Sequence, residues 1–290
     1  MAKGQSGGQK SVGTFDEALR KLITPQRLAI VMAAITIFLL FRPLFLPIKI
    51  GFQTTDFYNR LEALKPGDNV VYSTDTVPGD FLGGRRDIYK AVINHLIEKK
   101  VKIIFHPTAA GWSGVTDTIK KITNIGTLTY GTDYVFLPFV SGEEMAWASF
   151  AADMKGFYQT DIYGASLTTL PIFANVNSMS DVDLAVVQYG IFTWGEMFVR
   201  QWPTKYGVPM ICMALFSTLQ AWYGNQVKGN LDLDLGFAEY EALRKLPAEH
   251  ILRMEARNVV SLMIIAMIFV GTGLYWATGV SRGARTSMGV

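Results

Sequence analysis

The sequence predicts an α/β protein: a three-layer sandwich with a mainly parallel, Rossmann- or flavodoxin-like sheet, flanked by two transmembrane helices. Two observations lead to this prediction. Between residues 51 and 250, short continuous apolar runs alternate with helical segments, the pattern of βαβ units around a sheet covered on both faces. Outside this region, one long apolar run lies near each end of the chain. The expected order is therefore anchor, one soluble α/β domain at 51–250, and anchor.

Composition agrees with a single domain and argues against two classes of site. The chain has 290 residues, 50% of them hydrophobic, and two spans and a tail leave material for one core. The formal net charge is only +3 and the cations are spread along the chain, so no nucleic-acid partner is expected. Cys212 is the only cysteine, which excludes an internal disulfide and a multi-cysteine metal site.

The first apolar run, residues 28–48, is predicted to be a transmembrane helix. It begins LAIVMAAITIFLLF and resumes its apolar character after Arg42 and Pro43. About 21 residues at about 1.5 Å each suffice for about 30 Å of hydrocarbon. A signal peptide is the alternative, disfavoured because the following FRPLFLPIKI lacks a small-residue cleavage pattern. Residues 1–27 are expected to form a disordered tail with a short amphipathic stretch.

The second apolar run, residues 259–280, is predicted to be the second transmembrane helix, followed by a tail at 281–290. It is uncharged throughout and carries Tyr275 and Trp276 near its end, where aromatic belts form. Cations in the two tails favour a topology with both termini in the cytoplasm and the domain on the extracytoplasmic side. The lipid bilayer is therefore an expected partner.

The apolar runs of the domain predict five strands, at residues 69–73, 101–105, 134–140, 183–188 and 208–216. Helices are predicted at 85–99, around 116–122 and at 143–158, where the pattern becomes helical. The segment NLDLDLG alternates leucines with Asp232 and Asp234, which favours an extended sheet edge over a calcium loop.

Two short motifs carry a resemblance. TDYV lies at residues 132–135, and AEYE lies at 238–241 ahead of the last apolar run. This arrangement resembles an uncharacterised prokaryotic family of membrane-anchored α/β proteins of unknown function. The resemblance implies the same layout and carries no known activity.

Polar side chains at the carboxyl ends of the predicted strands are the first candidates for a site, because open α/β sheets bind ligands at that edge. They are Asp75, Thr76, Asp80, His106, Ser141 and Ser217. Asp75, His106 and Ser113 together are candidates for a hydrolytic triad. Ser113, however, stands in GWSGV, which is not the elbow motif of a nucleophilic serine, and Ser141 fits a helix cap.

A second candidate is an anion site where the first helix after the first strand begins. Amide groups and the helix dipole favour an anion there, and the residues concerned are Asp80, Gly83, Gly84, Arg85 and Arg86. The alternative is that the arginines are solvated or balanced by acidic neighbours. The chain has no dinucleotide or phosphate-loop motif, so no cofactor is expected.

The remaining reactive side chains favour structural roles. His95, His106 and His250 share no metal-ligand spacing, so no metal is expected. His95 belongs to the face pattern of a helix. Cys212 lies within a continuous apolar run and is predicted to be a buried, unreactive thiol.

The connection at 162–179 is too long and too apolar for an ordinary loop. Its apolar side chains would each leave about 1.5 to 3 kcal/mol of burial unrealised in water. They are Ile162, Leu167, Leu170, Ile172 and Phe173. We expect them to contact another protein subunit, a second copy of the chain or the lipid headgroup region, or to form a lid over the strand ends.

The leading hypothesis is a membrane-anchored, non-catalytic scaffold or assembly subunit. Tryptophans, which are enriched among interface anchors, favour it, and they stand at Trp112, Trp147, Trp194, Trp202 and Trp222. The alternative is a membrane-tethered hydrolase or ligand-binding domain that uses the strand-end residues. A triad in a concave pocket would favour the alternative, whereas apolar outer patches without such a pocket would favour a scaffold.

Overall fold

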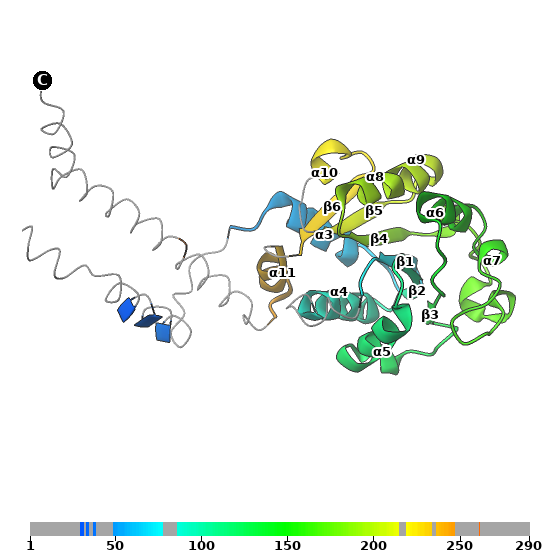
Figure 1. Cartoon of the computed structure of the whole chain (residues 1–290), viewed down its shortest axis with the longest axis horizontal. Coiled ribbons are helices and arrows are strands. Elements are labelled where there is room, and N and C mark those ends of the chain that lie inside the picture. The colour runs from blue at the N-terminus through cyan, green and yellow to red at the C-terminus, as the bar shows by residue number, and fades with distance from the viewer. Residues whose placement is uncertain are drawn as a thin grey trace, which may run out of the picture. The chain divides into compact units, whose positions relative to one another are not determined.

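The computed structural model describes residues 49–77, 86–214, 219–233 and 236–246, together with residues 30, 31, 33, 34, 37, 38 and 261. Contacts group Ile48–Ala248 into one unit, which is the α/β domain (Figure 1). Among the described residues, no helix is long and apolar enough to cross a membrane. The predicted spans at 28–48 and 259–280 lie almost wholly outside these residues, as do the two tails.

The domain is built on a parallel sheet with the strand order β3-β2-β1-β4-β5-β6. All five neighbouring pairs are parallel, which confirms the predicted α/β, Rossmann-like fold. The strands are β1 Asn69–Thr74, β2 Lys102–Pro107, β3 Tyr134–Phe136, β4 Leu184–Tyr189, β5 Met210–Ala214 and β6 Val227–Asp232. Because β1 lies beside β4, the chain changes direction across the sheet between these two strands. This switch point is where such folds bind ligands.

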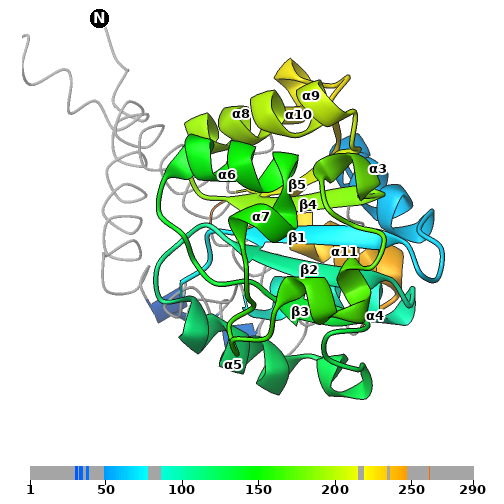
Figure 2. The same ribbon diagram turned by 90° about the vertical axis from the view of Figure 1, so that its right-hand side faces the viewer.

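Helices cover both faces of the sheet and complete the three layers (Figures 1 and 2). One face carries α3 Phe52–Glu62, α4 Arg86–Glu98, α5 Trp112–Ile122 and α11 Gly236–Arg244. The other carries α6 Glu143–Ala152, α7 Met154–Phe157, α8 Phe192–Gln201, α9 Pro203–Tyr206 and α10 Leu219–Trp222. Short 3-10 helices lie at Asn124–Thr127, Leu167–Thr169, Pro171–Phe173 and Met179–Asp181.

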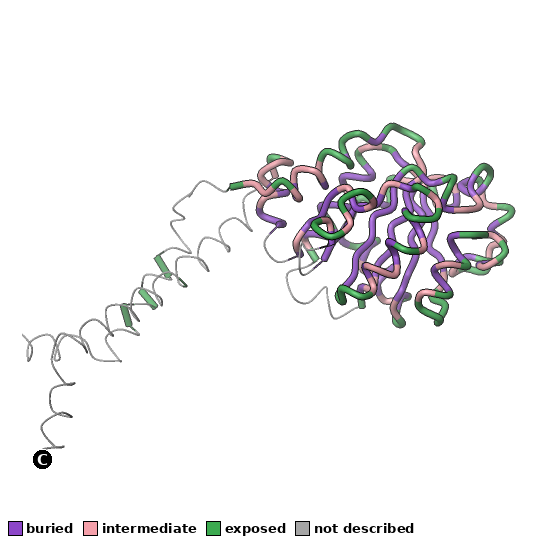
Figure 3. The backbone as a smooth tube through the Cα atoms, turned by 90° about the horizontal axis from the view of Figure 1, so that it is seen from above, coloured by how far each residue is buried: buried purple, intermediate pink, exposed green. Residues whose placement is uncertain are grey.

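The strands are buried on both sides, as Figure 3 shows, because each face of the sheet meets its own apolar cluster. Alternate residues of β1 point to opposite faces: Val70 and Tyr72 join one cluster, and Val71 joins the other. This two-sided burial explains why the strands read as continuous apolar runs.

The helix predicted at 143–158 is instead two helices, α6 and α7, separated by Asp153. Asp153 adopts an extended conformation, and its carboxylate accepts a hydrogen bond from the amide of Gly156 at 2.9 Å. The amide of Met154 donates to the carbonyl of Asn177 at 2.6 Å instead of continuing the helix. A side chain that caps a new helix thus competes with continuation of the old one.

Candidate functional site

The switch point between β1 and β4 holds a compact group of buried polar side chains. Thr74 and Gln188 are paired across the two strands. The side-chain carbonyl of Gln188 accepts hydrogen bonds from the Thr74 hydroxyl at 2.5 Å and from the Thr76 hydroxyl at 2.9 Å. It also accepts one from the backbone amide of Asp75 at 3.1 Å. The three side chains are buried, so they hold one another in place.

Asp75, the residue after β1, contacts the chain just after β4 at the same edge. Its carboxylate accepts a hydrogen bond from the amide of Gly190, the residue after β4, at 2.5 Å. Any side chain at position 190 would place its Cβ only 3.1 Å from that carboxylate oxygen, so glycine fits best. These contacts therefore lie at the edge of the sheet where such a fold binds a ligand.

His106 is fully buried beside this edge, and its partner is Ser73. The Ser73 hydroxyl lies 2.9 Å from Nδ1 of His106, because the parallel register pairs the two residues. The imidazole stacks on Phe150 with ring centroids 4.3 Å apart. It also packs in T-shaped arrangements with the rings of Tyr158 and Trp202. Burial lowers the pKa of His106 to about 3, so the ring is neutral at physiological pH.

Comparison with protein-family models, with curated proteins and with solved structures finds no match to this chain.

In the described residues, no contact joins the three residues of the expected triad, Asp75, His106 and Ser113. Ser113 is exposed in the first turn of α5, where its carbonyl accepts a hydrogen bond from the Thr116 hydroxyl at 2.8 Å. The serine that does meet His106 is Ser73, which sequence reasoning missed. Aligning the ends of the apolar runs VVYST and IIFHP in parallel register would have found it.

The anion site predicted near the start of α4 falls mostly outside the described residues. Asp80, Gly83, Gly84 and Arg85 are among the undescribed residues, as are Ser217, Asp234 and His250. Arg86 is the first residue of α4 and is exposed. The described residues contain no group of three or more His, Cys, Asp or Glu side chains that could hold a metal ion.

Two predictions about single residues have clear outcomes. Cys212 is buried, as predicted, and burial raises the pKa of its thiol, which keeps it protonated and unreactive. The helix-cap prediction for Ser141 is wrong, because the residue that caps α6 is Gly142 and no side chain bonds the cap. Gly142 has a φ of 138°, a conformation that disfavours a side chain.

The domain itself covers most of the connection at 162–179. Leu167, Ile172 and Phe173 are buried in the cluster under α6 and α8, and Ile162 and Leu170 are partly buried. The energetic reason for placing a partner on these side chains therefore no longer applies. The exposed aromatic residue of this region is Tyr163, at 56%.

The five tryptophans that were predicted to anchor an interface differ in how far they are buried. Trp112, Trp147 and Trp202 belong to the core, and Trp194 is partly buried. Trp222, at the end of α10, is 76% exposed. Trp222 therefore stands out among the side chains expected to anchor an interface.

A groove of about 340 Å³ lies next to the segment that carries Trp222, along β6 and between α3 and α10. Gln220 spans it by donating a side-chain hydrogen bond to the carboxylate of Asp56 at 2.9 Å. The side-chain oxygen of Gln220 is buried and accepts no hydrogen bond within the described residues. The groove is lined by Asp56, Asn59, Arg60, Ala63, Gln220, Gly224, Val227 and Lys228. Asp56 and Gln220 are 164 positions apart, so no local pattern could predict this groove.

Proposed function

We propose that this protein is a membrane-anchored, non-catalytic scaffold subunit that binds another protein subunit through the Trp222 surface. We define the Trp222 surface as Trp222 together with the residues lining the groove between α3 and α10. The observation that carries the proposal is the 76% exposure of Trp222 in α10, the helix whose Gln220 lines that groove. The anchors are the two apolar runs at 28–48 and 259–280.

The composition of the Trp222 surface fits a protein interface. A tryptophan offers a large rigid apolar contact, and such residues dominate the binding energy of many interfaces when a partner excludes water from them. Arg60, Lys228 and Asp56 line the groove and supply charged groups of the kind found in the polar rim of an interface.

The strand-end residues support a structural role for the sheet edge. His106 is neutral and enclosed by aromatic rings, and its partner Ser73 is equally buried. Gln188 and Asp75 are engaged with neighbouring groups across the switch point. A hydrolase would need a nucleophile and a base that a substrate can reach. This arrangement favours the scaffold over a membrane-tethered hydrolase.

The test is the particle size of the full-length protein, extracted in a mild detergent from the membranes in which it is naturally made. Trp222→Ala should abolish the larger species and leave a folded, smaller one, because an exposed side chain contributes little to folding. Tyr163→Ala is the matched control, since it removes another exposed aromatic residue from a different region. If the Trp222→Ala particle keeps its size, or if both variants lose the larger species equally, the proposal fails.

A further inference from the structure

Exposed large apolar side chains gather at one edge of the sheet, the edge formed by the carboxyl ends of the strands. Their exposure ranges from 37% to 76%. They follow β1, β3 or β4 or lie at the start of α6 or α8, and they are Val77, Phe139, Val140, Met145, Ile191 and Phe192. We call these six residues the apolar edge.

The opposite edge of the sheet is different. Among the described residues, the turns that lead into the amino ends of the strands carry no large apolar side chain that is exposed, and the one such residue next to them is Trp222, which ends α10 just before the turn into β6. Their exposed positions include Lys65, Lys100 and Asp183. The asymmetry matters because single exposed apolar residues such as Trp222 are ordinary, whereas a set of six gathered at one edge indicates a contact surface.

The chain enters the domain at the apolar edge. Helix α3 runs antiparallel to β6: Thr54 lies against Gly236, just beyond the carboxyl end of β6, and Phe57 packs on Gly229 in its middle. The later residues Arg60 and Ala63 line the groove together with Val227 at the amino end of β6. The first residue of α3, Phe52, is therefore at the carboxyl-end side, where it is 66% exposed.

This start of the domain is fixed in place. The amide of Gly51 donates to the carboxylate of Glu239 in α11 at 2.8 Å, and the Thr55 hydroxyl donates to the carbonyl of Gly51 at 2.9 Å. The predicted first span ends at residue 48, so only residues 49–51 separate it from α3. Three residues extend at most about 11 Å. A chain that leaves a bilayer at residue 48 must therefore keep the start of α3, at the carboxyl-end side of β6, close to the membrane surface.

From these two observations we infer that the apolar edge rests on the lipid bilayer, with its side chains in the headgroup region. The inference rests on the membrane anchoring in the proposed function and adds an orientation of the domain to it. Amphipathic protein surfaces bury their apolar residues about 5 to 10 Å deep at this boundary. The described charges near the edge are mixed, with Glu143 and Asp75 against Lys49 and Arg86, so contact depends on apolar burial and little on lipid charge.

Fluorescence quenching by lipids tests this orientation in the full-length protein. Single cysteines replace Met145 and Ile191 at the apolar edge, and Lys65 in the turn before β1 serves as the matched control at the opposite edge. The native Cys212 is buried and stays unlabelled. Each variant is labelled with an environment-sensitive dye and reconstituted into vesicles of neutral phosphatidylcholine that contain headgroup spin-labelled lipid. We expect quenching at Met145→Cys and Ile191→Cys to be at least threefold stronger than at Lys65→Cys, and to persist in high salt.

Each outcome bears on a separate claim. Flotation of the same vesicles after alkaline extraction measures anchoring independently of the dye. If the protein floats but all three positions are quenched equally, or Lys65→Cys is quenched most, the orientation is wrong and the scaffold proposal stands. If the protein does not float, the anchoring fails, and the orientation fails with it. Trp222→Ala should change neither flotation nor quenching, which separates this surface from the partner-binding one.

Discussion

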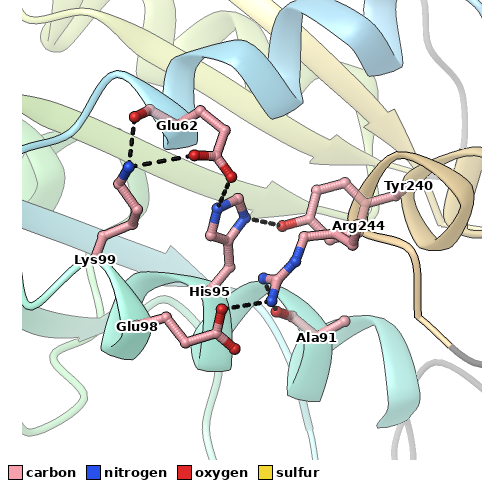
Figure 4. A network of polar contacts seen from close by, with 7 residues as sticks. All are labelled: Glu62, Ala91, His95, Glu98, Lys99, Tyr240 and Arg244. Atoms are coloured by element: carbon pink, nitrogen blue, oxygen red, sulfur yellow. Dashed lines mark hydrogen bonds and ion pairs between the residues drawn. The ribbon is translucent and has the colours of Figure 1, made fainter.

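His95 and His106 are both almost completely buried, but they pack on opposite faces of the sheet and in contrasting surroundings. His95 belongs to α4, and Figure 4 shows it between Glu62 of α3 and Tyr240 of α11. Its Nε2 lies 2.9 Å from the carboxylate of Glu62 and its Nδ1 lies 2.7 Å from the Tyr240 hydroxyl. His106 has one hydrogen-bond partner in the described residues, Ser73, and is otherwise surrounded by aromatic rings.

The hydrogen bonds of His95 fix its protonation. A carboxylate only accepts, so Nε2 carries the proton that is donated to Glu62, and Nδ1 accepts from the Tyr240 hydroxyl. Both bonds are made by a neutral ring. Burial, assisted by the nearby Arg244, lowers the pKa of His95 to about 4 despite the opposing effect of Glu62. Both His95, in its polar network, and His106, among its aromatic rings, are therefore neutral.

The two clusters stabilise the domain differently. The His95 cluster joins α3, α4 and α11 through directional bonds, including Lys99 to Glu62 and Arg244 to Glu98. It thereby holds the first and last helices of the domain together. The His106 cluster joins β1 and β2 to α6 and α8 through packed rings, so its stability depends on buried area. Stabilisation by polar bonds and stabilisation by packed rings should respond differently to substitution, pH and salt.

The largest effect is expected for Trp202→Ala, in the His106 cluster. Trp202 is completely buried, packs on Phe198 with ring centroids 4.6 Å apart, and donates its indole N–H to the carbonyl of Trp147 at 3.1 Å. Its removal leaves a cavity and deletes the hydrogen bond to α6, which should cost about 3 to 5 kcal/mol of unfolding free energy. Urea unfolding of the full-length protein in nanodiscs measures this loss. Trp222→Ala is the control, expected within about 0.5 kcal/mol of wild type; a similar small loss at Trp202 would contradict the packing account.

The second prediction concerns pH, where the two histidines should behave alike. Both have an ordinary pKa of 6.5 that folding lowers, to about 4 for His95 and about 3 for His106. Between pH 6.5 and 4 the two histidines therefore bind more protons in the unfolded chain than in the folded one. Their contribution to the unfolding free energy is fully present above pH 6.5 and decreases as the pH is lowered. Each histidine should remove about 1 to 2 kcal/mol between pH 6.5 and pH 5.

His106→Leu tests the assignment, because it should abolish about half of this pH dependence whatever it does to stability at pH 7. The carboxylates of Glu144 and Asp181, whose pKa values are lowered by Arg200 and by the Asn177 amide respectively, lose their contribution only at lower pH. Between pH 6.5 and 5 the change in unfolding free energy is therefore expected to come from the histidines. A wild-type unfolding free energy that is flat across this window would show that neither ring is buried in its neutral form.

Much of the fold could be predicted because strands that are buried on both faces have continuous apolar sequences. The failures have local causes. The third strand was predicted to reach residue 140 but ends at Phe136, since Pro138 has no amide to donate to a ladder. The last strand, β6, was expected only as an extended edge at 230–236, because Lys228, Gly229 and Asn230 interrupt its apolar pattern. Glycine is needed at 229, where a Cβ would lie 2.4 Å from the backbone nitrogen of Phe57.

The candidate surfaces were harder to predict, since they depend on which apolar residues remain uncovered. Nothing in the local pattern distinguishes Phe173, which is buried, from Ile191, which is exposed. The difference arises when 3-10 helices fold the connection at 162–179 into the cluster beneath α6 and α8. The sequence predicted candidate polar residues at the strand ends, but the pairing of Ser73 with His106 depends on a register that no single strand reveals.

The smallest effect is expected in the His95 cluster, at the ion pair between Arg244 and Glu98. Their side chains meet at 2.7 Å, but Glu98 is 58% exposed while Arg244 is only 9% exposed. Because water screens the carboxylate, Glu98→Gln should cost no more than about 1 kcal/mol, and less at high salt. Arg244 also lies 3.5 Å from the carbonyl of Ala91, so the variant leaves it with a partner. Urea unfolding at low and high salt measures both quantities. A loss above about 2 kcal/mol that salt does not reduce would mean that this network, like the aromatic cluster on the other face, is shielded from solvent.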